Sequence, residues 1–322
     1  MFATLILGVV LSCTLSAFPA EEEDGKVKAD SLLVMFWNLE NFFDSEDMGM
    51  SSSDRDFSPE GERSWSDSRF YRKCRLISKA ILWIGSRHGR IPDVMGFAEV
   101  ENRRTLVRLL KSTALRKMGY RIIHWDSPDH RGIDVALLFR EDLLSLQDAR
   151  PVPLTGMATR DILHVHLESR QTDLSYDWLV CHLPSKYGGP SSEPRRVRAA
   201  GVIEEVVDSI LQVRPAARVT VMGDFNDVPS SPAFDGLRPH LELVFPQKEV
   251  IGTIRFNGKW EWIDLFWTNF AGVRMEIVQI PFLLVKDSTH SGEKPLRTYQ
   301  GPRYLGGVSD HCPIVLKIAD AL

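Results

Sequence analysis

The chain has 322 residues, of which 43% are hydrophobic and 25% are charged, and its formal net charge at pH 7 is −4. Its length is enough to bury a large core, and its composition is ordinary for a globular protein. The small negative charge excludes a strong overall basic field for binding nucleic acid, although a local basic surface could still bind phosphate.

The N-terminal residues have the features of an export signal. A short apolar run, Leu5–Leu11, is followed by small residues, and it is too short to span a bilayer stably. We therefore predict a signal peptide over residues 1–20, an acidic linker over 21–30 and one domain over 31–322. The residues around Cys13 also resemble a lipoprotein cleavage box, so a lipid anchor stays open. Export predicts a periplasmic, extracellular or envelope-anchored protein.

Short apolar runs alternate with longer stretches whose apolar residues recur at helical spacing. The predicted strands are Leu32–Trp37, Asp93–Ala98, Val135–Phe139, Ile162–Leu167, Trp178–Cys181, Arg218–Met222, Ile263–Trp267 and Pro313–Ile318. The predicted helices are Ser68–Arg87, Arg103–Lys117 and Arg195–Val213. We expect a loop over Met48–Ser66 and irregular structure over Thr253–Trp262 and Thr289–Gly307. Many strands with few helices favour two packed sheets flanked by helices.

The cysteines do not form a zinc or redox motif. No Cys-x-x-Cys pair is present, and beyond Cys13 the chain has only Cys74, Cys181 and Cys312. An odd number of thiols cannot be fully paired within one chain. We expect three buried or half-buried free thiols.

Polar side chains lie at the ends of six of the predicted strands. They are Asn38 with Glu40, Glu99, His182, Asp224 with Asn226, Asp264, and Asp310 with His311. Such groups are costly to bury without partners. If they converge, cations among them must offset their charge.

The residue types indicate the kind of cation. Asparagine and carboxylate oxygens suit hard ions such as Mg²⁺, Mn²⁺ or Ca²⁺, whereas thiolates are missing and the two histidines lack a zinc-type spacing. A divalent ion held by carboxylates would clamp a phosphoryl oxygen, and histidines beside it would transfer protons. The pattern predicts hydrolytic attack on a phosphate ester.

In this order, the residues resemble the DNase I-like endonuclease/exonuclease/phosphatase superfamily, from about Leu33 to Leu316. The segments similar to family motifs are Trp37–Glu40, Ala98–Val100, Gly223–Asn226 and Ser309–His311. The resemblance implies an α/β fold, a four-layer α/β/β/α sandwich of two mixed sheets flanked by helices. The chain is most similar to exported bacterial members, whose motifs do not imply a substrate.

The resemblance also implies roles for single residues. It places Glu99 as the principal metal ligand, with Asn38, Glu40 and Asp310 near the metal. It assigns Asp224 and Asn226 to the attacking water, pairs Asp264 with His311, and sets His311 on the phosphate or as a base. His182 matches a histidine of deoxyribonuclease I and the sphingomyelinases, and we predict that it helps to protonate the leaving oxygen.

Other residues allow two interpretations. Arg195, Arg196 and Arg198 open a predicted helix, where they form either a solvated basic face or phosphate contacts. We predict that Arg195 and Arg198, together with Asn38, bind substrate. Asp134 is either a strand-end residue or a group that orients His182. We expect Glu101 to be an ordinary surface residue.

The sequence therefore predicts hydrolysis of phosphodiester bonds with Mg²⁺ or Mn²⁺, with Ca²⁺ as a further possibility. DNA or RNA is the leading substrate, and we expect a monomer without a stable protein partner. The first alternative is a phospholipid or sphingomyelin phosphodiesterase, or a phosphatase. A remote alternative is a non-catalytic envelope binding protein on the same fold.

Overall fold

The computed structural model of the chain describes residues 31–49, 51–186, 189–248 and 252–319. The predicted export signal, the acidic linker and Cys13 lie outside the described residues. Within the described part of the chain, no helix has the length and apolar character needed to cross a membrane. The other three cysteines are buried and free, as the sequence predicts.

Two sheets of six strands each form the centre of the molecule. The order in the first sheet is β13 (Val273–Ile277), β18 (Ile314–Ile318), β1 (Leu32–Phe42), β2 (Val94–Val100), β4 (Asp134–Arg140) and β3 (Tyr120–His124). The order in the second sheet is β5 (Leu144–Val152), β6 (Ile162–Ser169), β7 (Ser175–His182), β8 (Arg218–Asp224), β12 (Asp264–Thr268) and β9 (Glu242–Leu243). Both sheets are mixed, because β1 pairs with β2 and β7 with β8 in parallel, whereas the other neighbours are antiparallel.

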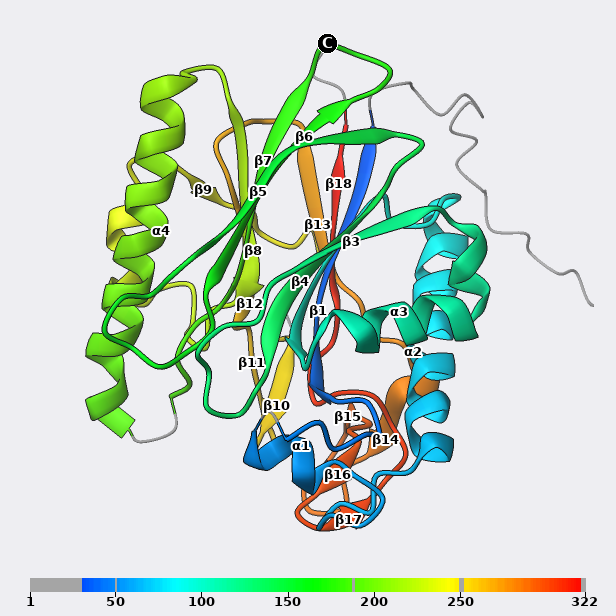
Figure 1. Ribbon diagram of the computed structural model, residues 1–322. Helices are drawn as coiled ribbons and strands as arrows, with labels where there is room; N and C mark the ends of the chain where they lie inside the picture. Colours follow the sequence, from blue (N-terminus) through cyan, green and yellow to red (C-terminus); the bar gives the residue numbers. More distant parts are fainter. Residues whose placement is uncertain (1–30, 50, 187–188, 249–251, 320–322) are drawn as a thin grey trace, which may run out of the picture.

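Helices cover the outer faces of both sheets. Helices α2 (Asp67–His88) and α3 (Arg103–Ser112) lie on the first sheet, and α4 (Glu193–Val213) lies on the second (Figure 1). The predicted four-layer α/β/β/α sandwich is confirmed.

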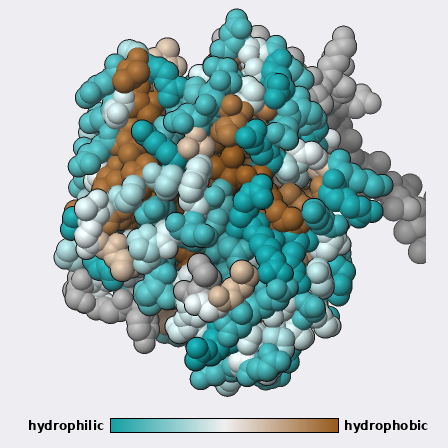
Figure 2. Space-filling model, viewed as in Figure 1, coloured by the Kyte–Doolittle hydropathy of each residue, from teal (hydrophilic) through white to brown (hydrophobic). Residues whose placement is uncertain are grey.

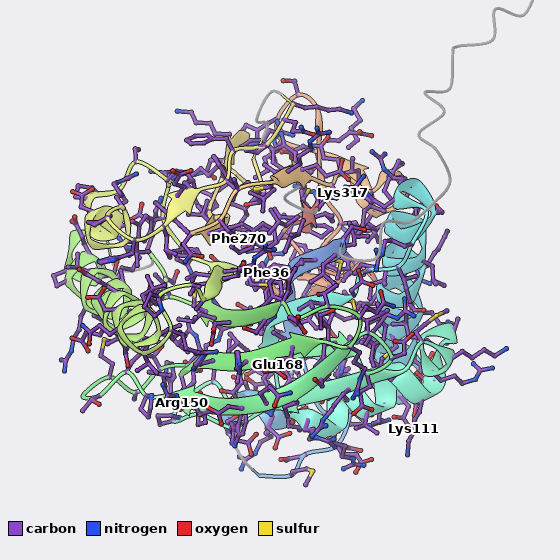
Figure 3. All side chains as sticks on the ribbon, turned by 90° about the horizontal axis from the view of Figure 1, so that it is seen from above. Phe36, Lys111, Arg150, Glu168, Phe270 and Lys317 are labelled. Carbon is purple, nitrogen blue, oxygen red and sulfur yellow. The ribbon has the colours of Figure 1, made fainter. Side chains whose placement is uncertain are left out.

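The sequence of β1 explains how the layers pack. Side chains alternate between the two faces of a strand, so Val34 and Phe36 join the core between the sheets, and Leu33 and Met35 join the core under α2 and α3. All four are buried, which accounts for the nearly continuous apolar sequence of a strand covered on both faces. Figure 3 looks down on these layers, with Phe36 inside and Lys111 at the periphery.

The C-terminal ends of α2 and α3 follow from the residues found there. Gly89 follows α2 with φ of 69°, a left-handed conformation that glycine adopts without steric cost. The predicted helix Arg103–Lys117 is wrong in extent, because α3 ends at Ser112 and a 3-10 turn, Ala114–Lys117, follows. The Thr113 hydroxyl donates to the Leu109 carbonyl and accepts from the Leu115 amide, and these bonds compete with helix continuation.

All eight predicted strands are present, but the structure contains more. Strands β3, β5, β9 and β13 were not predicted; β5 is an edge strand with exposed polar residues and Pro151, so it lacks an apolar run. The expected loop and irregular segments also contain short elements: α1 (Ser52–Asp56) and the strands β10 (Ile254–Phe256), β11 (Lys259–Glu261), β15 (Glu293–Pro295), β16 (Tyr299–Gln300) and β17 (Arg303–Tyr304). A further short strand, β14 (Leu284–Lys286), precedes the segment Thr289–Gly307 and pairs with β15. These strands form two-stranded hairpins too short to show a period in the sequence.

Candidate active site

The polar strand ends meet at one end of the two sheets, the lower end in Figure 1. In the second sheet, Asp224 at the end of β8 pairs with His182 of β7 on one side and with Asp264 of β12 on the other. In the first sheet, Asn38 of β1 lies beside Ala98 of β2, one residue before Glu99. The sheet register therefore gathers side chains that are far apart in the sequence.

His311 is held between two carboxylates. Its Nδ1 lies 2.8 Å from Asp264 Oδ2, and its Nε2 lies 3.7 Å from Asp224 Oδ2. Burial by itself lowers the pKa of His311, but Asp264 and Asp224 together raise that pKa well above its usual value. At neutral pH the ring is therefore an imidazolium. The Thr253 hydroxyl fixes the start of β12 by accepting a hydrogen bond from the Asp264 amide.

Asp224 lies at the centre of the cluster. Its Oδ2 accepts a hydrogen bond of 3.0 Å from Asn38 Nδ2, and its Oδ1 accepts one of 2.9 Å from the Asn226 amide. Burial raises the pKa of Asp224 to about 7, while the charge on His311 lowers it. Asp224 can therefore gain and lose a proton near neutral pH.

His182 is uncharged, in contrast to His311. Its Nε2 is 3.5 Å from Asp224 Oδ2, and no described residue hydrogen bonds to its Nδ1. Burial, together with the charges of Arg160, Arg131 and His311, lowers the pKa of His182 well below its usual value. The ring is neutral at pH 7.

Asn226 makes one hydrogen bond through its backbone amide and another through its side chain. Its φ is 51°, a left-handed conformation that asparagine tolerates better than most residues. This turn lets its amide reach Asp224, while its Nδ2 donates to the Leu183 carbonyl at 2.9 Å. Asn226 therefore joins the ends of β7 and β8 and orients Asp224.

A second cluster lies near the end of β1. We call it the acidic group, and it consists of Glu40, Glu99, Asp310 and Asn38. Arg297 contacts Glu40 Oε1 at 2.7 Å and Asp310 Oδ2 at 3.1 Å, and the Thr298 amide donates to Glu40 Oε2. The buried Lys73 amine donates to the Glu40 carbonyl at 2.6 Å. Burial and then Asp310 raise the pKa of Glu40 to about 8, although Arg297 and Lys73 lower it.

Glu99 is placed by a distorted strand end. The β1–β2 register shifts between Asn38 and Phe42, and Glu40, Asn41 and Glu99 have φ values of 47°, 50° and 60°. A left-handed non-glycine residue costs roughly 1–2 kcal/mol, and such strain gathers at functional sites. It brings Glu99 Oε2 within 2.8 Å of the Asn41 amide.

The donor set fits the hard cation that the sequence predicts. Glu40, Glu99, Asp310 and Asn38 offer carboxylate and amide oxygens, and none of the described cysteines belongs to the set. Guanidinium groups already lie against these carboxylates, Arg297 on Glu40 and Arg131 on Glu99 at 3.3 Å. The structure thus places positive charge where the ion is expected.

A second set of possible ligands overlaps the histidine cluster. One atom each from Asp224, Asp264 and His311 lies within 4.8 Å of the others. Two of its three residues, His311 and Asp264, already share a contact of 2.8 Å.

The predicted arginines lie apart from the cluster. Arg195 and Arg198 are exposed, and Arg198 borders a hollow with Arg150 and Glu205 instead. Arg196, between them, is buried and donates to Asp227 Oδ2 at 3.1 Å. Substrate binding by Arg195 and Arg198 stays a prediction.

Three arginines that contact the site residues were not predicted from the sequence. Arg297 and Arg131 contact the acidic residues, and Arg160 donates to the His182 carbonyl. A single arginine in an irregular segment carries no periodic signal, so the sequence could not identify them. A hollow of about 300 Å³ beside the acidic group is lined by Glu40, Arg131, Arg297 and Arg63 among others.

Comparisons with known proteins agree with this geometry. The model of the Endonuclease/Exonuclease/phosphatase family matches residues 33–320. An endonuclease/exonuclease/phosphatase family protein from Bacteroides thetaiotaomicron aligns with a TM-score of 0.59 and 14% identity, over 89% of this chain and 97% of that chain. The mannosyl-6-phosphatase of the same species has a TM-score of 0.58 and 15% identity, over 88% and 98%.

The human Nocturnin catalytic domain, solved with a bound sulfate anion, aligns with a TM-score of 0.56 and 19% identity, over 89% of this chain and 93% of that chain. At such identities the likeness to solved structures shows the fold alone. No curated protein sequence matches the chain.

Proposed function

Because this chain belongs to the endonuclease/exonuclease/phosphatase family, whose members are phosphoesterase hydrolases, we propose that it hydrolyses phosphodiester bonds, with DNA or RNA as the leading substrate. The observation that carries the proposal is the position of the buried His311 ring between the carboxylates of Asp264 and Asp224. A fixed positive group with a neighbouring base is what hydrolysis of an anionic ester requires.

The acidic group would hold the metal, since family members generally use divalent ions. We assign Glu99, Asp310, Glu40 and the Asn38 amide oxygen as its ligands. The bound ion would offset charge on the phosphoryl oxygens.

The other side chains would then orient substrate and move protons. The His311 Nε2–H would donate to a phosphoryl oxygen and stabilise its developing charge. Asp224, with a pKa of about 7, would accept a proton from the attacking water. The hydrogen bond from Asn38 Nδ2 would hold the Asp224 carboxylate in place.

The charge state of His182 changes the role that the sequence suggested for it. A neutral ring at pH 7 is a poor proton donor to a leaving oxygen, so we propose that His182 contributes a hydrogen bond. This leaves His311 as the charged histidine of the pair.

A phosphomonoesterase is the second candidate. The 300 Å³ hollow beside Glu40 is lined by Arg63, Arg131 and Arg297, which could hold the phosphate of a small molecule rather than a polymer. The structurally similar mannosyl-6-phosphatase is named for such a reaction.

The lipid alternative has less support. The hairpin β10–β11 lies beside the site and exposes Phe256, but Lys259 is also exposed on it and Trp260 is half-buried. The lower end of the face in Figure 2 is mainly hydrophilic. Such a surface suits a polar substrate better than a membrane.

A substrate panel would test the proposal. Plasmid DNA, RNA, sphingomyelin vesicles and phosphorylated sugars would be assayed with Mg²⁺, Mn²⁺ and Ca²⁺, using Asp224→Asn as the inactive control. We expect cleavage of DNA or RNA. Release of inorganic phosphate from sugars without cleavage of any diester would favour the second candidate, and no hydrolysis of any substrate would refute both.

The metal assignment makes a separate prediction. EDTA should abolish hydrolysis, and Mg²⁺ or Mn²⁺ should restore it. Glu99→Gln should weaken Mn²⁺ binding, measured by calorimetry, by about tenfold or more while leaving the midpoint of thermal unfolding of the metal-free protein nearly unchanged. Full activity in metal-free buffer would rule out the assigned role of the acidic group.

A further inference from the structure

Another cluster of residues that could bind a metal ion lies at the hairpin formed by β3 and β4, and we call it the hairpin cluster. His124 pairs with Ala136 in the antiparallel register, and Asp126 and Asp134 each lie two residues nearer to the loop that joins the strands. One atom each from His124, Asp126 and Asp134 lies within 4.8 Å of the others.

The hairpin cluster lines a hollow that contains polar atoms without partners. The hollow has a volume of about 440 Å³, and His124, Asp134 and Glu101 are among its walls. The His124 side chain is 2% exposed, and no described residue hydrogen bonds to its Nε2, which lies 3.9 Å from Asp134 Oδ2. Glu101 is also buried, contrary to the expected surface position, and its Oε1 has no partner among the described residues.

Buried nitrogen and oxygen atoms are rarely left without a partner, because each costs roughly 1–3 kcal/mol. The His124 Nε2 has no such partner among the described residues, so its lone pair is free for coordination. Five of the residues that line the hollow are Asp or Glu and two are Arg, so a cation would relieve an excess of acidic groups.

We propose that His124, Asp126 and Asp134 bind a divalent transition-metal ion at a site separate from the active site. One imidazole with two carboxylates suits Zn²⁺ or Mn²⁺ better than Mg²⁺. Ligands about 2.1 Å from a tetrahedral ion lie about 3.4 Å apart, so the distances between the ligand atoms must shorten by up to about 1.4 Å on binding. Asp126 can supply this movement, because its side chain is 71% exposed.

Arg103 is the positive group that opposes binding here, since its charge acts on His124. Arg103 is exposed at the start of α3 and can turn towards solvent. The Asp134 Oδ2 atom is available to bind the ion, because the Oδ1 atom accepts a hydrogen bond of 3.1 Å from the Ser127 amide.

The ion would fix the loop between β3 and β4, which reaches the active site at two points. Arg131 in this loop contacts Glu99 at 3.3 Å. Asp129 in the same loop binds Arg160 at 3.0 Å, and Arg160 donates to the His182 carbonyl at 3.1 Å. The second site would therefore hold residues that position Glu99 and His182 without touching the substrate.

Metal binding can be measured without reference to catalysis. The experiment uses Glu99→Gln protein, in which the principal ligand of the active-site metal is removed, and equilibrium dialysis against Zn²⁺ and Mn²⁺ with metal analysis. We expect one bound Zn²⁺ per chain. Adding Asp126→Asn or His124→Gln should weaken Zn²⁺ binding by about tenfold or more.

Asp148→Asn, an exposed carboxylate on β5, is the matched control and should bind Zn²⁺ like the parent protein. The Co²⁺ absorption spectrum should report a nitrogen ligand that His124→Gln removes. Because Asp126 is exposed, its variant should fold even if His124→Gln does not. The proposal fails if Glu99→Gln protein binds no Zn²⁺, or if Asp126→Asn binds it as tightly as the control.

Discussion

Two buried aspartate–histidine pairs each include an aspartate of the second sheet, and they differ in their surroundings. His311 Nδ1 is 2.8 Å from Asp264, and His164 Nε2 is also 2.8 Å from Asp177. The first pair lies in the active site. In the second, Asp177 lies in the interior of β7, five residues before His182, and it also binds Arg214 at 2.7 Å. The chain therefore contains its own control for the catalytic pair.

Asp264→Asn should reduce kcat by about 10²- to 10⁴-fold, because the ring of His311 loses the carboxylate that keeps it charged. The alkaline limb of the pH–rate profile should also move to lower pH. Asp177→Asn removes an equivalent buried carboxylate and should leave kcat and the profile unchanged. Steady-state kinetics across pH would check this, and equal losses in the two variants would contradict the assigned role of Asp264.

Asp177 should instead contribute to stability in a pH-dependent way. Burial by itself raises the pKa of Asp177, but the hydrogen bonds from His164 and Arg214 lower that pKa below its usual value. A depressed pKa in the folded state stabilises the fold above the unfolded pKa of about 3.9, and this stabilisation is lost as the pH falls through the folded pKa.

Asp177→Asn should therefore lower the free energy of unfolding by about 1–3 kcal/mol at pH 7, and by less at about pH 3. Urea unfolding of both proteins at the two pH values measures the difference. A destabilisation that grows on acidification would show that the Asp177 carboxylate is not stabilised in the folded state.

At the scale of single elements, two glycines in or next to helices should respond in opposite ways to the same substitution. Gly89 ends α2 with φ of 69°, whereas Gly201 lies inside α4 with open space where a Cβ would be added. Steric room is equal, because nothing lies within 4 Å of either position. Only the backbone conformation differs.

Gly89→Ala should destabilise the protein by about 1 kcal/mol, since alanine is strained in the left-handed region. Gly201→Ala should stabilise it by about 0.5–1 kcal/mol, since glycine loses more backbone entropy in a helix. Urea unfolding of the two variants against the wild type provides the test. Stabilisation by both would mean that the end of α2 does not need the left-handed residue.

At the scale of the whole molecule, the two sheets approach each other closely at a glycine. A Cβ on Gly96 of β2 would lie 3.0 Å from the Met222 sulfur of β8 and 3.1 Å from the Phe36 ring. A larger residue here must push the sheets apart or displace these side chains.

Gly96→Val should destabilise the protein by about 1–3 kcal/mol through overpacking. Met222→Ala alone should also destabilise, by leaving a cavity, but the double variant should be more stable than the sum of the two losses predicts. A double-mutant cycle measured by urea unfolding would detect this coupling. Strictly additive losses would place the tight contact elsewhere.

The sequence by itself determined the position of eight strands and the chemistry at their ends. Both are local properties: alternation of buried side chains follows from the geometry of one strand, and the polar residues adjoin each apolar run in the sequence. Asn38, Glu99, Asp224 and His311 could therefore be predicted as site residues. Edge strand β5 and the short hairpins could not, because exposed or very short strands carry no such pattern.

Only the tertiary structure decided which of these groups interact and which are charged. The contacts of Arg297 and the burial of Glu101 depend on sheet register and on loops remote in sequence. The opposite pKa shifts of His182 and His311 follow from the carboxylates and cations around each buried ring. A sequence lists these groups, but the distances and the exclusion of water that determine their electrostatics exist only in the folded chain.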